Sequence, residues 1–136
     1  MERRVGVLIA DDRSTARRAL RALLTLYPQV EVVGEAVDGQ EAIHFVSESH
    51  PDVVVMDMQM PVMDGVEATR CIKEQCPEVR VIALTMYAKY RAEALAAGAD
   101  AFLLKDGRPG ALLGAILDQV QGPTGQSAAP GRVSSQ

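Results

Sequence analysis

Short apolar runs alternate five times with stretches that have the periodicity of an amphipathic helix. The apolar runs cover residues 5–10, 30–37, 51–56, 79–84 and 101–104, and the helical stretches cover residues 14–27, 39–49, 65–75, 88–97 and about 112–120. Successive strand–helix units need crossovers between parallel strands, and right-handed crossovers place helices on both faces of one sheet. We therefore predict an α/β fold with a doubly wound, five-stranded parallel sheet.

Individual residues mark the expected ends of the helices. Asp38 and Asp64 are each followed three residues later by a glutamate, a pattern typical of a helix start in which the first side chain caps backbone N–H groups. Leu95 is the only large apolar residue of the alanine-rich stretch 88–97, so we expect it on the buried side. A helix with so little apolar area should be easy to shift.

Length and composition limit the classes of protein. A chain of 136 residues suits one domain, which we assign to residues 1–121, and the Gly/Pro-rich stretch 122–136 is predicted to be a flexible linker or tail. The 18 acidic residues exceed the 13 basic residues before position 122, so we expect no contact with nucleic acid. Neither a membrane span nor a signal peptide is evident, which predicts a cytoplasmic protein without membrane contact.

Five polar residues stand where predicted strands end. Asp11 and Asp12 follow the first strand, Asp57 the third, Thr85 the fourth and Lys105 the fifth. Carboxyl ends of parallel strands share one edge, where ligands bind in such folds. Three crowded carboxylates repel one another and, unless one is protonated, need a cation; oxygen ligands favour Mg²⁺. The ion, the lysine and the threonine hydroxyl would together receive a phosphoryl group, with one aspartate as nucleophile.

Lys105 differs from the other basic residues in its expected place. Lys73 and Lys89 fall on predicted helices, where we expect them to be solvated. The arginines of the first predicted helix are likewise expected to form a solvated face: Arg17, Arg18 and Arg21. Lys105, in contrast, ends a buried strand beside the acids.

Four segments together resemble the receiver domain of bacterial two-component response regulators. They are residues 7–12, 57–65, 83–85 and 102–105, and the resemblance extends over residues 5–121. It implies the flavodoxin-like strand order 2-1-3-4-5. It also implies a signalling domain rather than an enzyme, one that assists its own phosphorylation and dephosphorylation.

The resemblance implies a role for each site residue. Asp57 would accept a phosphoryl group from a phosphohistidine of a sensor histidine kinase. Asp11, Asp12, Asp57 and the backbone carbonyl of Gln59 would hold Mg²⁺, and Lys105 would contact the phosphoryl oxygens.

A switch is also implied by the resemblance. Thr85 would move to the phosphoryl group and Phe102 would turn inward behind it, changing the surface formed by residues 88–97, 101–104 and 112–120. That surface would contact the output domain of the same protein or a downstream protein, or a second copy after phosphorylation.

The residue after Lys105 departs from a common family pattern. Many members have proline there with a cis peptide bond, whereas Asp106 follows here, and a cis bond before a non-proline residue would cost about 2.5–4 kcal/mol. Lys-Asp at this place resembles the subfamily with a C-terminal helix-turn-helix module. The chain would then be the input half of a transcription regulator; a stand-alone phosphoryl shuttle is the alternative.

Two other functions fit the same fold less well. A haloacid-dehalogenase-like phosphohydrolase separates its first two acids by one residue, whereas Asp11 and Asp12 are adjacent, and it has no role for Asp57. A flavin-binding module needs a first loop that cradles phosphate, and two adjacent acids repel phosphate there.

Overall fold

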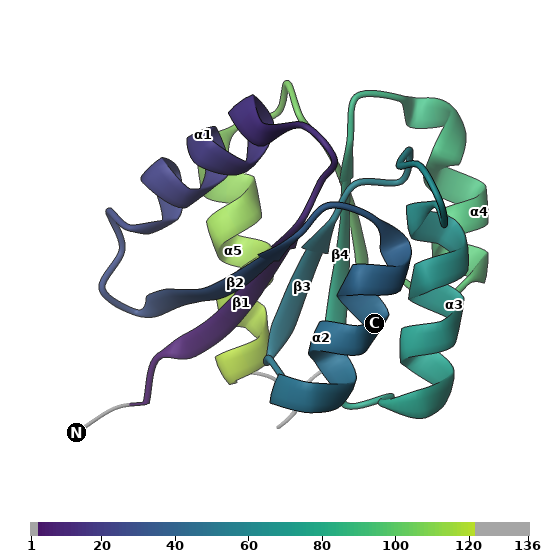
Figure 1. Ribbon diagram of the computed structural model, residues 1–136. Helices are drawn as coiled ribbons and strands as arrows, with labels where there is room; N and C mark the ends of the chain where they lie inside the picture. The colour runs from purple at the N-terminus through teal and green to yellow at the C-terminus, as the bar shows by residue number, and fades with distance from the viewer. Residues whose placement is uncertain (1–2, 122–136) are drawn as a thin grey trace, which may run out of the picture.

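The computed structural model describes residues 3–121 of the chain (Figure 1). Its elements are β1 (Val5–Ala10), α1 (Ser14–Leu24), β2 (Val30–Ala36), α2 (Gly39–Ser49), β3 (Val53–Met56), α3 (Gly65–Gln75), β4 (Arg80–Thr85), the 3₁₀ helix η1 (Ala88–Tyr90), α4 (Arg91–Ala96), β5 (Ala101–Leu104) and α5 (Pro109–Gln121). The predicted linker 122–136 lies outside the described residues. No helix within residues 3–121 is long and apolar enough to span a bilayer.

The five strands form one parallel sheet with the order β2-β1-β3-β4-β5. Helices α1 and α5 cover one face of the sheet, and α2, α3 and α4 cover the other (Figure 1). The predicted fold class and strand order are therefore confirmed.

The central strand β3 explains the four-residue apolar run in the sequence. All of its residues are buried. Val53 and Val55 pack in the apolar layer under α1 and α5, whereas Val54 and Met56 pack in the layer under α2, α3 and α4. A strand that is covered on both faces has no solvent-facing position, so its sequence shows no alternation.

The helix starts follow the local signals. The Asp38 side chain accepts a hydrogen bond from the Glu41 N–H at 2.9 Å, and Asp64 accepts one from the Glu67 N–H at 2.9 Å, which confirms both predicted caps. Helix α5 begins at Pro109, where the fixed φ of proline suits the first helical turn. The sequence predicted a start at about residue 112, because the glycines at 107, 110 and 114 obscure the boundary.

The segment 88–97 differs from its prediction. It consists of η1 and the six-residue α4, and within α4 Ala94 is the buried residue. Leu95 is 41% exposed, so its predicted burial was wrong. A stretch rich in alanine has too little contrast between its faces to determine which one meets the sheet. A small buried residue such as Ala94 agrees with the expectation that this helix buries little apolar area.

Other element ends also differ from the prediction: β2 ends at residue 36 instead of 37, and β3 begins at residue 53 instead of 51. Helix α1 stops at Leu24 instead of residue 27, and the chain continues in turns in which Leu26 N–H and Tyr27 N–H donate to carbonyls three residues back. Strand β4 covers residues 80–85 rather than 79–84, so Thr85 is part of the strand.

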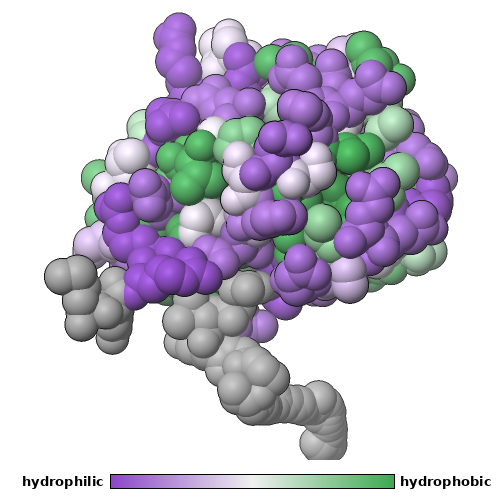
Figure 2. Space-filling model, turned by 60° about the horizontal axis from the view of Figure 1, so that its bottom comes forward, coloured by the Kyte–Doolittle hydropathy of each residue, from purple (hydrophilic) through white to green (hydrophobic). Residues whose placement is uncertain are grey.

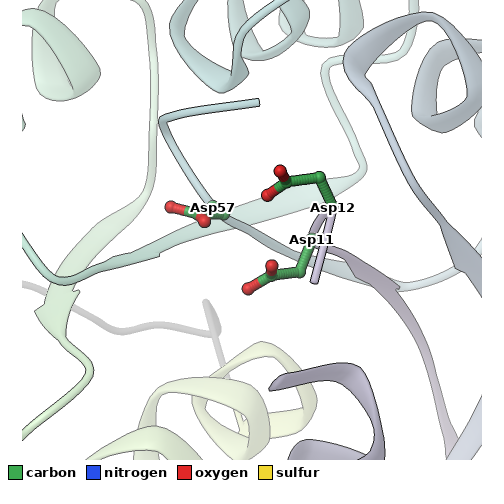
Figure 3. A group of neighbouring side chains, drawn as sticks. All are labelled: Asp11, Asp12 and Asp57. Carbon is green, nitrogen blue, oxygen red and sulfur yellow. The ribbon is translucent and has the colours of Figure 1, made fainter. Parts of the chain in front are cut away.

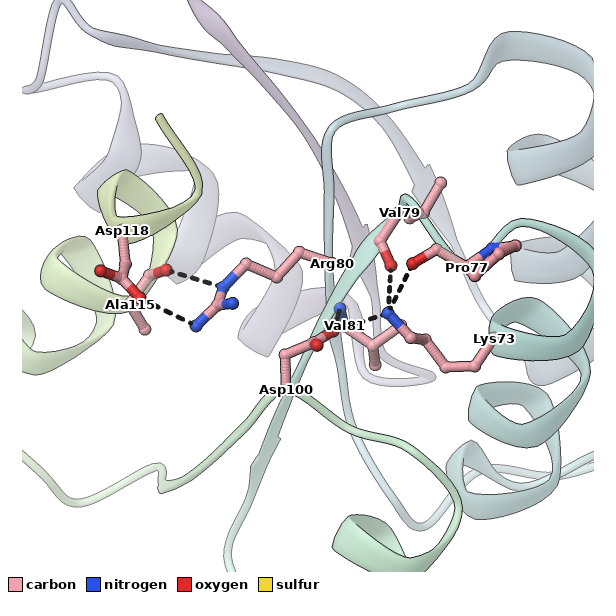
Figure 4. A network of polar contacts seen from close by, with 8 residues as sticks. All are labelled: Lys73, Pro77, Val79, Arg80, Val81, Asp100, Ala115 and Asp118. Carbon is pink, nitrogen blue, oxygen red and sulfur yellow. Dashed lines mark hydrogen bonds and ion pairs between the residues drawn. The ribbon is translucent and has the colours of Figure 1, made fainter. Parts of the chain in front are cut away.

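Lys73 ties α3 to the start of β4 and to the loop before β5 (Figure 4). Its Nζ donates to the carbonyls of Pro77 and Val79 at 3.0 and 2.9 Å and to Asp100 Oδ2 at 2.9 Å. Its side chain is 18% exposed, so the prediction of a solvated lysine was wrong. On the opposite side of the strand, Arg80 Nε donates to the Ala115 carbonyl and Arg80 Nη2 to Asp118, both of α5 (Figure 4).

Asp52 holds the amino end of the sheet together. Its carboxylate accepts hydrogen bonds from the Gly6 N–H at 2.8 Å and from Arg3 at 2.6 and 2.7 Å. These bonds, chiefly that from Arg3, lower the pKa of Asp52 below the usual range of an aspartate.

Hydrophilic residues predominate on the face seen in Figure 2, with hydrophobic ones in small separate patches.

We expect the stabilising effect of the Asp52 charge to disappear in acid. A group whose pKa is lowered by folding stabilises the folded state above its unfolded pKa, and the effect is lost as pH falls through the folded pKa. Asp52→Asn should therefore lower the free energy of unfolding at pH 7, and the difference from the wild type should shrink as the pH falls below the unfolded pKa of about 3.9 and through the lower folded pKa. Urea unfolding across this range measures the difference. A constant difference at all pH values would contradict this assignment.

Candidate metal centre

Three carboxylates meet at the carboxyl edge of the sheet (Figure 3). Asp11 and Asp12 follow β1 and Asp57 follows β3, and these strands are neighbours with Ala10 opposite Met56. One oxygen from each carboxylate lies within 4.8 Å of the other two. The structure thus brings together the three acids that the sequence placed at this edge.

Each of the three acids has a different environment. Asp11 is buried, and its carboxylate accepts hydrogen bonds from the Arg13 N–H at 2.9 Å and from Lys105 Nζ at 2.6 Å. Asp57 is 8% exposed and accepts from the Gln59 N–H and from Lys105 Nζ, both at 3.3 Å. Asp12 is exposed. Lys105 therefore lies between the two less exposed carboxylates.

The charge of the cluster favours a further cation. One ammonium group among three close carboxylates leaves an excess of negative charge. All three acids offer oxygen ligands, which suit hard ions such as Mg²⁺. The donor set therefore fits a divalent metal ion.

A cavity of about 420 Å³ opens over the cluster. It is lined by Asp12, Arg13, Asp57, Gln59, Met60, Pro61, Met86, Tyr87 and Lys105. Segments that follow four strands, β1, β3, β4 and β5, form its walls. A small anionic group in the cavity would reach both the Asp57 carboxylate and the ammonium of Lys105.

Thr85 and Phe102 lie outside the lining of this cavity. Thr85 is fully buried at the end of β4, and its Oγ1 accepts a long hydrogen bond of 3.5 Å from the Tyr87 N–H. Phe102 is half-buried on β5, and the Arg91 guanidinium carbon lies 5.8 Å from the centre of its ring. Neither residue is among the described residues that line the cavity.

The peptide bond after Lys105 is trans, since the described residues contain no cis bond. The Lys105 N–H donates to the Thr85 carbonyl at 2.8 Å, which continues the pairing of β5 with β4 beyond the last residue of β5. The lysine thus reaches the acids from ordinary strand geometry, without the cis peptide bond that is common in the family resembled.

Gly65 allows α3 to start directly against the Asp57 loop. Its N–H donates to the Met58 carbonyl at 3.0 Å. A Cβ at this position would overlap the Asp57 carbonyl oxygen and lie 2.8 Å from Met58 Cα. A side chain here would push on the backbone that carries Asp57.

Val62 adopts a strained conformation in the loop between Asp57 and α3. Its φ of 69° lies in the left-handed region, and its side chain is 77% exposed. A β-branched residue is unfavourable there because its Cβ crowds the backbone, and solvent exposure of this side chain leaves little packing to compensate.

Val62→Gly should raise the free energy of unfolding by about 0.5–1 kcal/mol. The substitution relieves the strain of the left-handed conformation, and the greater backbone entropy of glycine in the unfolded state offsets part of that gain. Val37→Gly is the matched control, because Val37 is 38% exposed and does not have a positive φ. The control should lower stability. Thermal and urea unfolding measure both. Equal loss in the two variants would contradict the assignment of strain.

Sequence reasoning missed the contact of Arg17 with the loop of acids. Arg17 was expected on a solvated face, but its side chain is 15% exposed and its Nη1 donates to the Asp11 carbonyl at 2.7 Å. Its Nε donates to Glu35 of β2. Arg17 and Glu35 are 18 positions apart, and no local sequence pattern indicates that they meet.

Comparisons with known proteins agree with this geometry. Residues 7–117 match the model of the response regulator receiver domain. The transcriptional regulatory protein YhcZ of Bacillus subtilis (strain 168) is 41% identical over 105 residues, which cover 76% of this chain and 49% of that protein. The chain thus spans about half the length of the curated relatives that it matches.

Solved structures show the same arrangement. A two-component response regulator of the LuxR family from Aurantimonas sp. SI85-9A1 superposes with a TM-score of 0.82 at 32% identity, covering 93% of this chain and 89% of that one. The response regulator domain of Thermotoga maritima CheB gives 0.81 at 32% identity, covering 89% and 99%. On the match to the family model, with the fold and the acidic edge in agreement, this chain belongs to the response regulator receiver domain family.

Proposed function

We propose that this chain is the phosphoacceptor domain of a two-component response regulator, with Asp57 as the acceptor. The observation that supports this choice is the position of Asp57, which lines the cavity, is close to two other carboxylates and lies 3.3 Å from Lys105 Nζ. An Asp57 oxygen would form a bond to phosphorus while the P–N bond of a kinase phosphohistidine breaks. The donor imidazole would leave with the electron pair of that bond.

Mg²⁺ is the proposed metal, held by the carboxylates of Asp11, Asp12 and Asp57 and the backbone carbonyl of Gln59. When bound, it would neutralise charge on the phosphoryl oxygens. Lys105 Nζ would contact a phosphoryl oxygen from the other side, because it already lies 3.3 Å from Asp57 Oδ2.

Transmission of the signal is assigned to Thr85 and Phe102. The Thr85 hydroxyl would donate a hydrogen bond to the phosphoryl group, and Phe102 would turn inward, shifting α4. The weak apolar attachment of α4, in which Ala94 is the buried residue, supports a shift at low cost. The surface of α4, β5 and α5 would then bind an output domain, a downstream protein or a second copy of the chain.

The proposed setting is a cytoplasmic regulator of transcription. Relatives such as YhcZ are named transcriptional regulatory proteins. We assign residues 1–121 to the receiver domain and residues 122–136 to a linker towards a helix-turn-helix output domain, with a sensor histidine kinase as the phosphoryl donor. The receiver domain itself would not contact DNA, given its excess of acidic residues.

The position of Asp11 favours this chemistry over that of a haloacid-dehalogenase-like hydrolase. Such an enzyme uses the first aspartate after the first strand as its nucleophile. Here Asp11 is buried, is bonded to Lys105 and Arg13, and does not line the cavity, whereas Asp57 does.

Intact-mass spectrometry after incubation with acetyl phosphate and Mg²⁺ tests the proposal. The wild type should gain about 80 Da, one phosphoryl group, and Asp57→Asn should gain none. Asp64→Asn is the matched control: it changes an acid of the same loop whose role is to cap α3, and asparagine also caps. This control should retain the adduct. An unmodified wild type, or an adduct that persists on Asp57→Asn, would overturn the proposal.

A further inference from the structure

A β-bulge changes the direction of side chains along β2. Val7 of β1 lies opposite Val32, but the next residue, Leu8, lies opposite Gly34, so Val33 is an extra residue in β2. Val32 packs in the layer under α1 and α5, whereas Ala36 packs in the layer under α2, α3 and α4. A bulge shifts the alternation by one residue.

The shift turns Glu35 toward α1. Glu35 lies opposite Ile9, which belongs to the apolar layer under α1 and α5. There its carboxylate accepts hydrogen bonds from Arg17 Nε at 2.8 Å and from Arg21 Nε at 2.7 Å. The bonds from Arg21 and then Arg17 lower the pKa of Glu35, so it is charged at neutral pH.

Arg17 differs from Arg21 in what else it binds. Its Nη1 also donates to the backbone carbonyl of Asp11 at 2.7 Å, and its side chain is 15% exposed against 44% for Arg21. Among the described residues, Arg21 makes no hydrogen bond to the loop after β1. The two arginines therefore share one carboxylate, but only Arg17 joins it to the loop of acids.

We infer that Arg17 is a positioning residue for the metal ligands of this chain: anchored to Glu35, it holds the Asp11 backbone so that the carboxylates of Asp11 and Asp12 stay turned toward Asp57. The inference rests on the proposed function, since it concerns the same metal site. A guanidinium suits the task because its fixed fork of N–H groups bonds a carboxylate and a carbonyl at once.

The sign of the effect separates positioning from charge. Arg17 is positively charged and lies close to the proposed Mg²⁺ site, so its charge alone would weaken Mg²⁺ binding. If charge were its only effect, removing Arg17 would tighten Mg²⁺ binding. If Arg17 instead holds the loop, its removal weakens binding, because the two acids lose their fixed geometry. Residues that orient metal ligands typically contribute about 10–100-fold to affinity.

Calorimetric titration with MgCl₂ tests the inference on the whole chain. Arg17→Met should raise the Mg²⁺ dissociation constant about tenfold, the lower end of the range for residues that orient ligands. Arg21→Met is the matched control, since it removes the other bond to Glu35 without touching the loop, and its dissociation constant should stay close to that of the wild type. Urea unfolding of both variants shows whether a variant binds Mg²⁺ more weakly only because its folded state is less stable.

The outcomes distinguish this inference from the proposed function. A wild type that binds no Mg²⁺ refutes the metal site itself. A wild type that binds, with Arg17→Met binding equally or more tightly, refutes only the positioning role. Equal weakening in Arg17→Met and Arg21→Met also refutes it.

If Arg17→Met does not fold, Arg17→Lys replaces it in the titration. The lysine keeps the positive charge but lacks the fork that bonds a carboxylate and a carbonyl together. It should still bind Mg²⁺ more weakly than Arg21→Met does, and affinity equal to that of the wild type would refute the inference.

Discussion

Replacing Gly65 by alanine is expected to lower the free energy of unfolding by about 3 kcal/mol or more, at the upper end of the range for overpacked sites. The added Cβ would overlap the Asp57 carbonyl and crowd Met58 Cα. These are backbone atoms, so no flexible side chain can move aside, and the start of α3 must separate from the loop. Urea unfolding measures the loss.

Gly114→Ala is the matched control for this substitution. Gly114 lies within α5, and a Cβ there would meet no atom within 4 Å. Alanine is favoured over glycine inside a helix, so this variant should gain about 0.5–1 kcal/mol. If the two variants changed stability alike, Gly65 would not be required for the close contact. Any Gly65→Ala protein that folds should also take up less phosphoryl group, because the overlap displaces Asp57.

Lys105→Met is expected to have two opposite effects. Without Mg²⁺ it should lower the free energy of unfolding by about 3 kcal/mol, because it leaves the buried carboxylate of Asp11 without its cation. It should also tighten Mg²⁺ binding, because the ammonium group that lies 2.6 Å from Asp11 and 3.3 Å from Asp57 no longer competes with the ion. Unfolding with and without MgCl₂ measures both effects.

Lys89→Met serves as the control for the loss of a lysine. Lys89 is exposed, and its Nζ lies 5.7 Å and 5.4 Å from the ring centres of Tyr87 and Tyr90. Losing these contacts should cost no more than about 1 kcal/mol and leave Mg²⁺ binding unchanged. Weaker Mg²⁺ binding in Lys105→Met would show that the lysine assists the metal site rather than competing with the ion.

The sequence predicted the fold because its signals are local and repeated. The uninterrupted apolar run at Val53–Met56 matches a strand buried on both faces, and the aspartates at 38 and 64 cap the helices that follow them. The strand ends predicted the candidate site for the same reason. Once the strands are parallel, the residues after β1, β3 and β5 must share an edge.

The features that escaped prediction depend on contacts between distant residues. Lys73 is drawn into the structure by Asp100, 27 positions further along the chain, and Arg17 meets Glu35 only because a bulge turns that glutamate toward α1. The spacing of residue types along the sequence does not indicate the bulge in β2. Leu95 was misplaced for another reason, since small neighbours left the orientation of α4 undetermined.

The response of stability to Mg²⁺ tests most directly whether the three carboxylates act as one metal site. The thermal unfolding midpoint is measured against MgCl₂ concentration at constant ionic strength for the wild type and for Asp12→Asn, whose acid is exposed and whose loss should not impair folding. The wild-type midpoint should rise with added Mg²⁺, because the ion binds the folded state, and the midpoint of Asp12→Asn should change far less. An equal response in the two proteins, or none in the wild type, would contradict the account.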